Sequence, residues 1–251
     1  MMQKNIYEYL LMLGDNSMIL GHRLSELCGH GPSLETDIAL TNISLDLFGQ
    51  VRSYFQYAAE LAVGDATEDS VAFMREEFQY RNVVLVEQEN KDFAHVITRQ
   101  FLFDAYYLPV LQFLVDSKDK TISEIAQKCI KELRYHYRFS SEWIKRLGDG
   151  TELSHNKIQD AVNLLYPYSS EFFRMNDIEE EMMNLGIGPD LNDIRKKFNN
   201  NVVAIFAEAG ISIPETQRLY DNGKNGVHSE HLGYILSQLQ YMQRAYPNMT
   251  W

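Results

Sequence analysis

FLFDAYYLPVLQFLV, residues 101–115, is the most apolar window in the 251-residue sequence. Its apolar residues leave no polar face, which predicts a helix that is buried on all sides. A helix of this kind needs other helices packed around it. The window is too short to span a bilayer and contains Asp104, so we do not expect a membrane helix.

Apolar residues elsewhere in the sequence recur every three or four positions, which is the period of an α-helix. This pattern, with few prolines and short breaks, predicts an all-α bundle in one domain over residues 1–251. The central helix should cover residues 93–115 and follow a turn at 88–92. We expect the other helices at 4–28, from Ser33 to about 63, at 68–86, 121–147 and 154–173, and starting near Pro189 and His228.

The overall charge excludes some classes of partner. The sequence has 23 Lys and Arg against 35 Asp and Glu, a net charge of −12, and no basic run. We therefore expect neither nucleic acid nor an anionic membrane as a partner. Cys28 and Cys129 are too few for a disulfide framework, and the N-terminal stretch lacks the pattern of a secretory signal. We expect buried, reduced thiols in a cytoplasmic protein.

A di-iron carboxylate centre is the one catalytic site that the sequence leaves open. Nucleotide-binding glycine motifs and a G-x-S-x-G nucleophile motif are both absent. A di-iron centre in a helical bundle uses four carboxylates and two histidines as ligands. In the sequence they occur as a glutamate followed by a Glu-x-x-His motif, and this arrangement appears twice. The carboxylates in this order are Asp46, Glu77, Asp104 and Glu132, but Tyr80 and Tyr135 stand at the two histidine positions.

Each carboxylate also has a simpler interpretation. Asp46 lies off the apolar face of its predicted helix, and Glu77 is beside Glu76, so either could be a solvated surface charge. Asp104 is the most informative, because an unpaired carboxylate in an apolar helix is costly. We expect it to be protonated, hydrogen-bonded or paired, and a tyrosine hydroxyl would be a sufficient partner.

His136 follows Tyr135 directly and lies four residues after Glu132. Both Glu132 and His136 fall on or near the inner stripe of the predicted helix, so a metal could bind this pair. The alternative is a buried histidine that is hydrogen-bonded to a neighbour on its own helix. We favour this alternative, since one histidine cannot replace the two that a di-iron site requires. If any metal binds, we expect Glu132 and His136 to bind it first.

Longer blocks of the sequence resemble the C subunits of the bacterial phenylacetyl-CoA epoxidase (ring 1,2-phenylacetyl-CoA monooxygenase). The similarity occurs in the order found in that family and spans nearly the whole chain. The blocks are LGDNSMILGHRLSELCGH (13–30), LETDIALTNISLDLFGQVRSYFQYAAEL (34–61), IKELRYHYRFSSEWIKRLGDGTE (130–152) and NGVHSEHLGYIL (225–236).

The resemblance implies a ferritin-like bundle with additional helices, in a structural subunit that lacks catalytic, cofactor and metal residues of its own. In that family a related A subunit holds the di-iron site, and the complex adds one oxygen atom of O₂ across the aromatic ring of phenylacetyl-CoA. A reductase with NADPH, flavin and iron–sulfur centres supplies electrons. The resemblance thus implies the A subunit and the other members of the complex as partners, and a homodimer is possible for the isolated chain.

Two other functions remain open at this point. The chain could be an autonomous di-iron oxidase or monooxygenase with an unusual ligand set, or a helical binding protein whose pocket lies where metals would otherwise be. The ligand set of the oxidase would be Asp46, Glu77, Asp104, Glu132 and His136.

Overall fold

The computed structural model describes residues 2–215, 222–247 and 249. Helix α4 (Phe93–Leu114) lies at its centre, and eighteen of its 22 residues are buried. Asp92 caps its start by accepting a hydrogen bond of 3.0 Å from the His95 backbone N–H. The predicted central helix is therefore confirmed.

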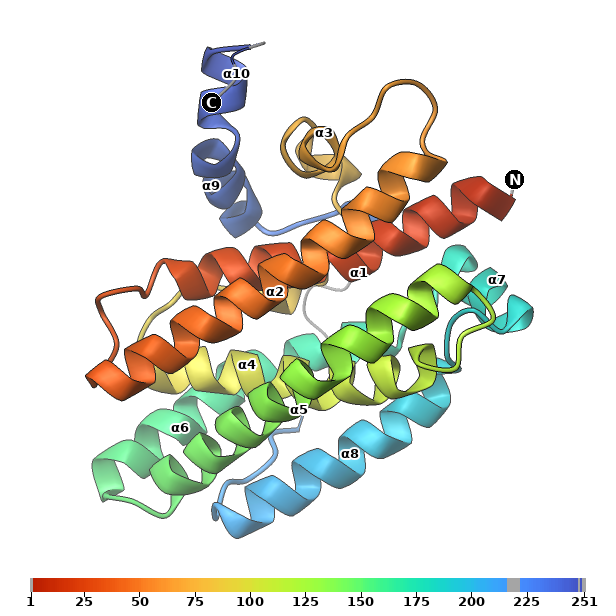
Figure 1. Ribbon diagram of the computed structural model, residues 1–251. Helices are drawn as coiled ribbons and strands as arrows, with labels where there is room; N and C mark the ends of the chain where they lie inside the picture. The colour runs from red at the N-terminus through yellow and green to blue at the C-terminus, as the bar shows by residue number, and fades with distance from the viewer. Residues whose placement is uncertain (1, 216–221, 248, 250–251) are drawn as a thin grey trace.

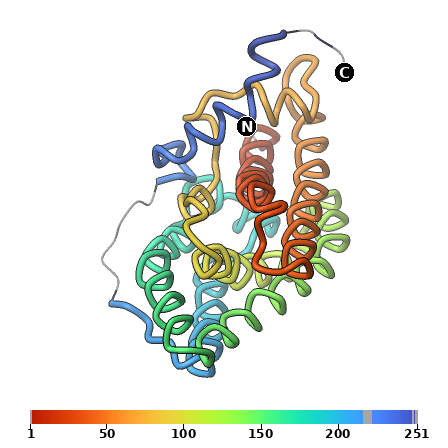
Figure 2. Tube along the Cα trace, turned by 90° about the vertical axis from the view of Figure 1, so that its left-hand side faces the viewer, coloured from red at the N-terminus to blue at the C-terminus, as the bar shows by residue number. Residues whose placement is uncertain are grey.

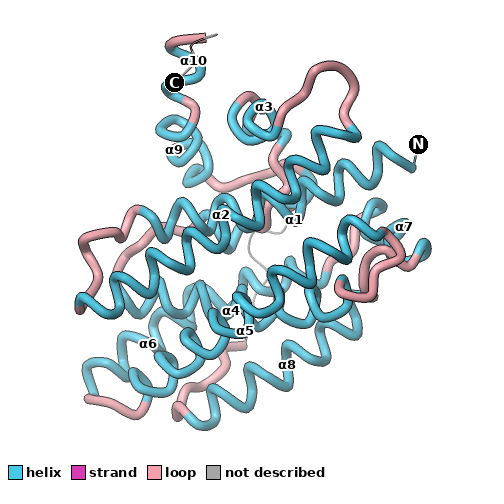
Figure 3. Tube along the Cα trace, in the orientation of Figure 1, coloured by secondary structure: helices cyan, strands magenta, loops and turns pink. Residues whose placement is uncertain are grey.

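Two antiparallel hairpins form the core of a ferritin-like bundle (Figure 1). A long crossover, residues 62–92, joins the first hairpin to the second, as is typical of ferritin-like folds. Figure 3 shows that most of this crossover is loop, with the short helix α3 (Glu68–Phe73) in it. The first hairpin is α1 (Met2–Ser25) with α2 (Leu34–Leu61), and the second is α4 with α5 (Lys120–Gly148).

Further helices extend the bundle on the α4 side. α6 and α8 both pack against α4 and α5, and α7 packs against α1. The last two helices, α9 and α10, lie beyond α1, on the side of the molecule away from α6 and α8 (Figure 2). The described residues contain no strand, and none of their helices is long and apolar enough to cross a membrane. The bounds are α6 (Glu152–Leu165), α7 (Asp177–Leu185), α8 (Leu191–Glu208), α9 (Glu230–Leu239) and α10 (Tyr241–Ala245), with 3₁₀ turns η1 (Glu77–Gln79), η2 (Val84–Glu87), η3 (Tyr166–Phe173) and η4 (Gly223–Asn225).

The predicted helix over residues 68–86 is wrong. The α-helix ends at Phe73, and the chain continues through the 3₁₀ turns η1 and η2. Side chains from distant elements replace the helical hydrogen bonds. The backbone N–H of Arg81 donates to Asp15, that of Val83 to Asn16, and that of Val84 to Glu171, over 2.7–2.8 Å.

The predicted environment of the two cysteines is correct for only one of them. Cys129 is buried in α5, whereas Cys28 is exposed just beyond the end of α1. Both thiols are free.

Glycines allow α1 and α2 to pack closely. A Cβ on Gly14 would overlap Cε1 of Phe55, and a Cβ on Gly21 would lie 3.1 Å from Cε1 of Phe48. The Ser44 hydroxyl also donates a hydrogen bond of 2.8 Å to the Gly21 carbonyl. The two phenylalanine rings thus occupy the space that side chains at 14 and 21 would need.

Gly14→Ala should lower the free energy of unfolding by about 1–3 kcal/mol, because the buried Phe55 ring would have to move. Gly49→Ala is the matched control, since Gly49 is an exposed position in α2 where an added Cβ would have nothing within 4 Å. The control should stabilise the protein by about 0.5–1 kcal/mol. Urea unfolding measures both, and equal effects would show that the close contact does not restrict residue 14.

Candidate functional site

A cluster of polar side chains lies where α2, α4 and α5 meet. Among the residues that the sequence predicted for a site, Asp46, Asp104 and His136 each form a hydrogen bond with a side chain of a neighbouring helix. We call the whole group the interior polar cluster. It comprises Asp46 and Gln50 from α2, Gln100 and Asp104 from α4, and Glu132, His136 and Ser140 from α5.

Asp104 is fully buried, and its carboxylate accepts two hydrogen bonds. Gln100 Nε2 donates to it from the preceding turn of α4, and Ser140 Oγ donates to it from α5, each over 2.8 Å. Burial raises the pKa of Asp104 to about 7, although His136 and the two hydrogen bonds act to lower it. The interior polar position predicted for Asp104 is correct, but its partners are a serine and a glutamine rather than a tyrosine.

His136 is fully buried and forms a hydrogen bond with Asp46 across the α2–α5 contact. Its Nε2 lies 3.0 Å from Asp46 Oδ2, and the Asp46 side chain is 34% exposed. The predicted partner on its own helix is therefore wrong. Asp46 turns toward α5 rather than fully outward, so it links the surface to the interior.

Glu132 is half-buried on α5, one turn before His136. Burial and the negative charge of Asp46 raise the pKa of Glu132. Tyr135, by contrast, is 40% exposed, with the guanidinium of Arg138 5.8 Å from the centre of its ring. Tyr135 thus lies on the surface and does not fill a former metal position.

Glu77 and Tyr80 lie outside the bundle centre, because the chain there is not helical. Glu77 is exposed in η1. Tyr80 is buried, and its hydroxyl donates to the Ala72 carbonyl over 2.8 Å and accepts from Gln240 Nε2 over 3.0 Å. The Arg75 guanidinium lies over its ring at 4.1 Å. The sequence spacing of 31 residues from Asp46 to Glu77 therefore does not reflect neighbouring bundle helices.

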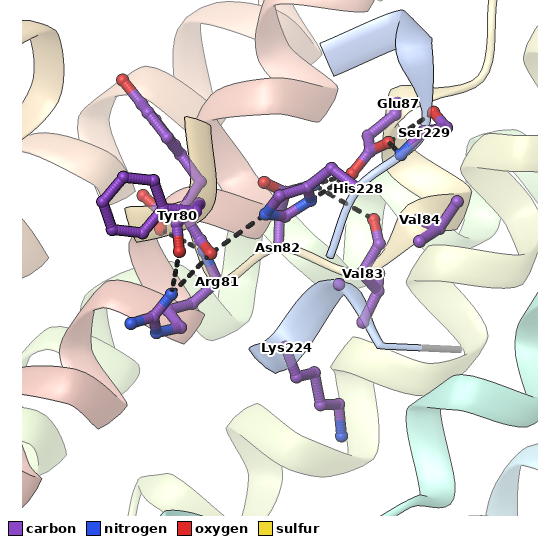
Figure 4. Close-up of polar contacts among 12 residues, drawn as sticks. Tyr80, Arg81, Asn82, Val83, Val84, Glu87, Lys224, His228 and Ser229 are labelled. Atoms are coloured by element: carbon purple, nitrogen blue, oxygen red, sulfur yellow. Dashed lines mark hydrogen bonds and ion pairs between the residues drawn. The ribbon is translucent and has the colours of Figure 1, made fainter. Parts of the chain in front are cut away.

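A separate set of polar contacts anchors the C-terminal helices to the crossover (Figure 4). Glu87 is fully buried in η2 and accepts hydrogen bonds from Asn82 Nδ2 over 2.9 Å and from the Ser229 backbone N–H over 2.9 Å. His228 Nδ1 lies 2.6 Å from the same carboxylate. Burial lowers the pKa of His228, but its bonding to Glu87 outweighs this effect and raises it overall. These contacts are structural, because Glu87 and His228 hold α9 against the body.

Comparison with known proteins agrees with the fold and the blocks quoted above. The sequence matches the family described as phenylacetic acid catabolic protein over residues 1–251. The chain belongs to this family. It is also 44% identical to the C subunit of 1,2-phenylacetyl-CoA epoxidase from Escherichia coli (strain K12) over 243 residues, which cover 97% of this chain and 98% of the relative.

For this member of the phenylacetic acid catabolic protein family, the interior polar cluster does not fit a di-iron centre. The cluster supplies one imidazole and three carboxylates, and Asp104 is already bonded to Gln100 and Ser140. In the described ranges, no three His, Cys, Asp or Glu side chains are arranged to hold a metal ion.

The fourth bundle helix is α1 rather than the predicted helix over 68–86, and it adds no free carboxylate. Glu8 and Asp15 are the only acidic residues of α1. Glu8 is paired with Arg81 at 3.0 Å, and Asp15 is paired with Arg75. Both acidic side chains of α1 are therefore neutralised by arginines of the crossover.

The free energy of unfolding should fall as pH rises from about 4 to about 7, through the contribution of Asp104. The folded protein holds this proton up to a pKa of about 7, whereas the ordinary value for aspartate is 3.8. The stabilisation by protonated Asp104 is thus fully present below the ordinary pKa and is lost as pH approaches 7. Between these values the free energy of unfolding should fall by about 1.4 kcal/mol per pH unit.

Asp104→Asn should remove this component of the pH dependence, because the side chain can no longer ionise. Urea unfolding at several pH values between 4 and 8 measures the difference in slope between the variant and the unmodified protein. The exposed Asp149→Asn, just after α5, provides the control with the same chemical change. Identical pH profiles for Asp104→Asn and the unmodified protein would contradict a proton held at Asp104.

Proposed function

We propose that the chain is a non-catalytic structural subunit of a multicomponent phenylacetyl-CoA 1,2-epoxidase, and that it stabilises the di-iron A subunit in aerobic phenylacetate degradation. The interior polar cluster carries this proposal, because it supplies one imidazole and three carboxylates, fewer than a di-iron centre uses, and Asp46 and Asp104 are hydrogen-bonded to other protein side chains. The 44% identity to a protein named as the C subunit of this epoxidase supports it.

In this proposal the interior polar cluster replaces metal coordination with hydrogen bonds. Ser140 connects α5 to Asp104 on α4, and His136 connects α5 to Asp46 on α2. These two inter-helix hydrogen bonds restrict how the helices can pack, although His136 Nδ1, Gln100 Oε1 and both side-chain polar atoms of Gln50 are buried without a hydrogen-bond partner among the described residues. The chain can then keep a defined bundle shape without a metal and serve as a scaffold.

The chemistry in this proposal takes place on other subunits of a cytoplasmic complex. The A subunit binds the acyl-CoA substrate and holds the di-iron centre, which activates O₂. A reductase subunit with flavin and iron–sulfur centres delivers electrons from NADPH. This chain contributes no cofactor, and its partners are proteins rather than nucleic acid or membrane.

Metal content tests the proposal directly. The chain purified alone from iron-supplemented cells should contain no stoichiometric iron, because Asp46 and Asp104 are already hydrogen-bonded and the cluster has only one imidazole. Elemental analysis and the visible absorption of an oxo-bridged centre give the two readouts. The di-iron A subunit, prepared in the same way, is the positive control. Stoichiometric iron in this chain would instead support an autonomous di-iron oxidase.

His136→Ala tests whether His136 stabilises the fold or takes part in the reaction. Removing a buried partner of Asp46 should lower the free energy of unfolding by about 1–3 kcal/mol. The yield of the assembled complex should fall with it, while turnover per assembled complex should stay unchanged. Thermal melting, co-purification and epoxidation assays measure the three quantities. Lost turnover in a complex that still assembles normally would contradict the structural role.

A further inference from the structure

Helices α2 and α5 form one outer side of the bundle, which we call the α2–α5 face. They contact each other, with α1 packed behind α2 and α4 packed behind α5. Figures 1 and 2 agree that both helices run along the same side, while α6 and α8 lie toward the opposite side. The helices added to the bundle therefore leave this face open.

Large aliphatic side chains are exposed on α2. Leu34 is 72% exposed, Ile38 is 51% exposed and Leu45 is 61% exposed. Their spacing of four and seven residues places all three on one side of the helix, which points away from the side that Ala39 and Asp46 present to α5. Single exposed leucines are common, but an apolar row at helical spacing is typical of a surface that packs against another protein.

The aromatic residues of α5 form a second row beside α2. Tyr135, Phe139 and Trp143 are four residues apart, and successive ring centres are 6.2 and 6.5 Å apart. Together with residues near the start of α2, including Glu35 and Ala39, they line a groove with a volume of about 360 Å³. Aromatic side chains that line a groove are common at the energetic centre of protein interfaces.

Positive charge is concentrated along the same helix. α5 has seven Lys and Arg and three Glu, a net charge of +4 within a chain of −12. Within the described residues, no carboxylate lies close enough for an ion pair with the exposed bases of its central turns. These bases, the α5 basic row, are Lys128, Lys131, Arg134 and Arg138. Such a row matches a partner surface that carries carboxylates.

The dimensions of the α2–α5 face are sufficient for a stable complex. α2 has 28 residues and α5 has 29, so each is roughly 40 Å long. Two adjacent helices, each about 10 Å across, present an area of roughly 800 Å². This is about the area that each partner buries in a specific interface of standard size.

We propose that the α2–α5 face docks an acidic helical surface of the di-iron subunit. The groove lined by Tyr135, Phe139 and Trp143 forms the apolar centre of the contact, the aliphatic row extends it on the outward side of α2, and carboxylates of the partner pair with the α5 basic row. This inference rests on the proposed function, because the partner is the catalytic member of that complex.

A second copy of this chain is a poorer match for the face. A two-fold contact would place α2 of one copy near α5 of the other. Asp37 of α2 already binds the backbone N–H groups of Gly29 and Gly31, and Asp46 is paired with His136. Of the four acidic residues of α2, Glu35 and Glu60 then remain to face the four bases of the α5 basic row, so a second copy would leave half of that charge unpaired.

The test uses the full chain with Lys131→Glu and Arg134→Glu combined. The control is Lys196→Glu with Lys197→Glu on the exposed side of α8, which makes the same charge change elsewhere. Titration calorimetry against the purified di-iron subunit measures the affinity, and circular dichroism confirms that both variants are folded. The α5 variant should bind at least about tenfold more weakly and lose the salt dependence of association, while the control binds normally.

Three outcomes would contradict or limit the inference. Equal affinity for the α5 variant and the control would overturn the docking surface, while binding by the unmodified chain would leave the proposed function intact. No binding by the unmodified chain at any salt concentration would instead overturn the proposed function. A homodimer of the isolated chain that the α5 variant disrupts, with unchanged affinity for the di-iron subunit, would assign the face to a second copy.

Discussion

The structure depends on the burial of α4 on all sides. A helix without a polar face cannot contact water along any side without exposing apolar surface, so each side has to be covered by another element. α5 covers one side as its hairpin partner, and α6 and α8 cover others. The fold therefore extends beyond four helices for a physical reason. The same burial excludes water from Asp104, so this carboxylate needs donors from the protein itself.

The donors that surround Asp104 supply the hydrogen bonds that its burial requires. Iron in a ferritin-like bundle ties several helices together through shared carboxylates. In this chain two hydrogen bonds connect the helices: the Ser140 hydroxyl joins α5 to α4, and the His136 imidazole joins α5 to α2, while the Gln100 amide supports Asp104 from within α4. Each link is worth little alone, but leaving any of them unmade would be costly in a buried site. In the scaffold role that we propose, a defined packing of the helices is sufficient, whereas an oxygenase also needs open coordination positions.

Much of the fold could be predicted from periodicity, but the site could be predicted only in part. The central helix, the α2 and α5 helices and the interior placement of Asp104 follow from local patterns. The crossover could not be predicted in this way, because the groups that prevent a helix over 68–86 come from α1 and η3. Asp15 and Glu171 are 66 and 87 residues away from the backbone groups that they bind. The pairing of His136 with Asp46, 90 residues apart, was missed for the same reason.

The contacts of the C-terminal segment have a consequence for how the chain is completed during synthesis. Glu171 accepts a hydrogen bond from the Gly223 backbone N–H, and Glu87 accepts one from the Ser229 backbone N–H. Both carboxylates are buried, yet these donors leave the ribosome well after the helices around them. A nascent chain that ends before Gly223 would leave Glu171 with the Val84 N–H and Glu87 with the Asn82 amide as donors, and would lack the remaining hydrogen bonds to both acids. The native contacts of the crossover are therefore completed only after residues 223–229 have emerged, which makes this segment a late requirement for the packing of residues far earlier in the chain.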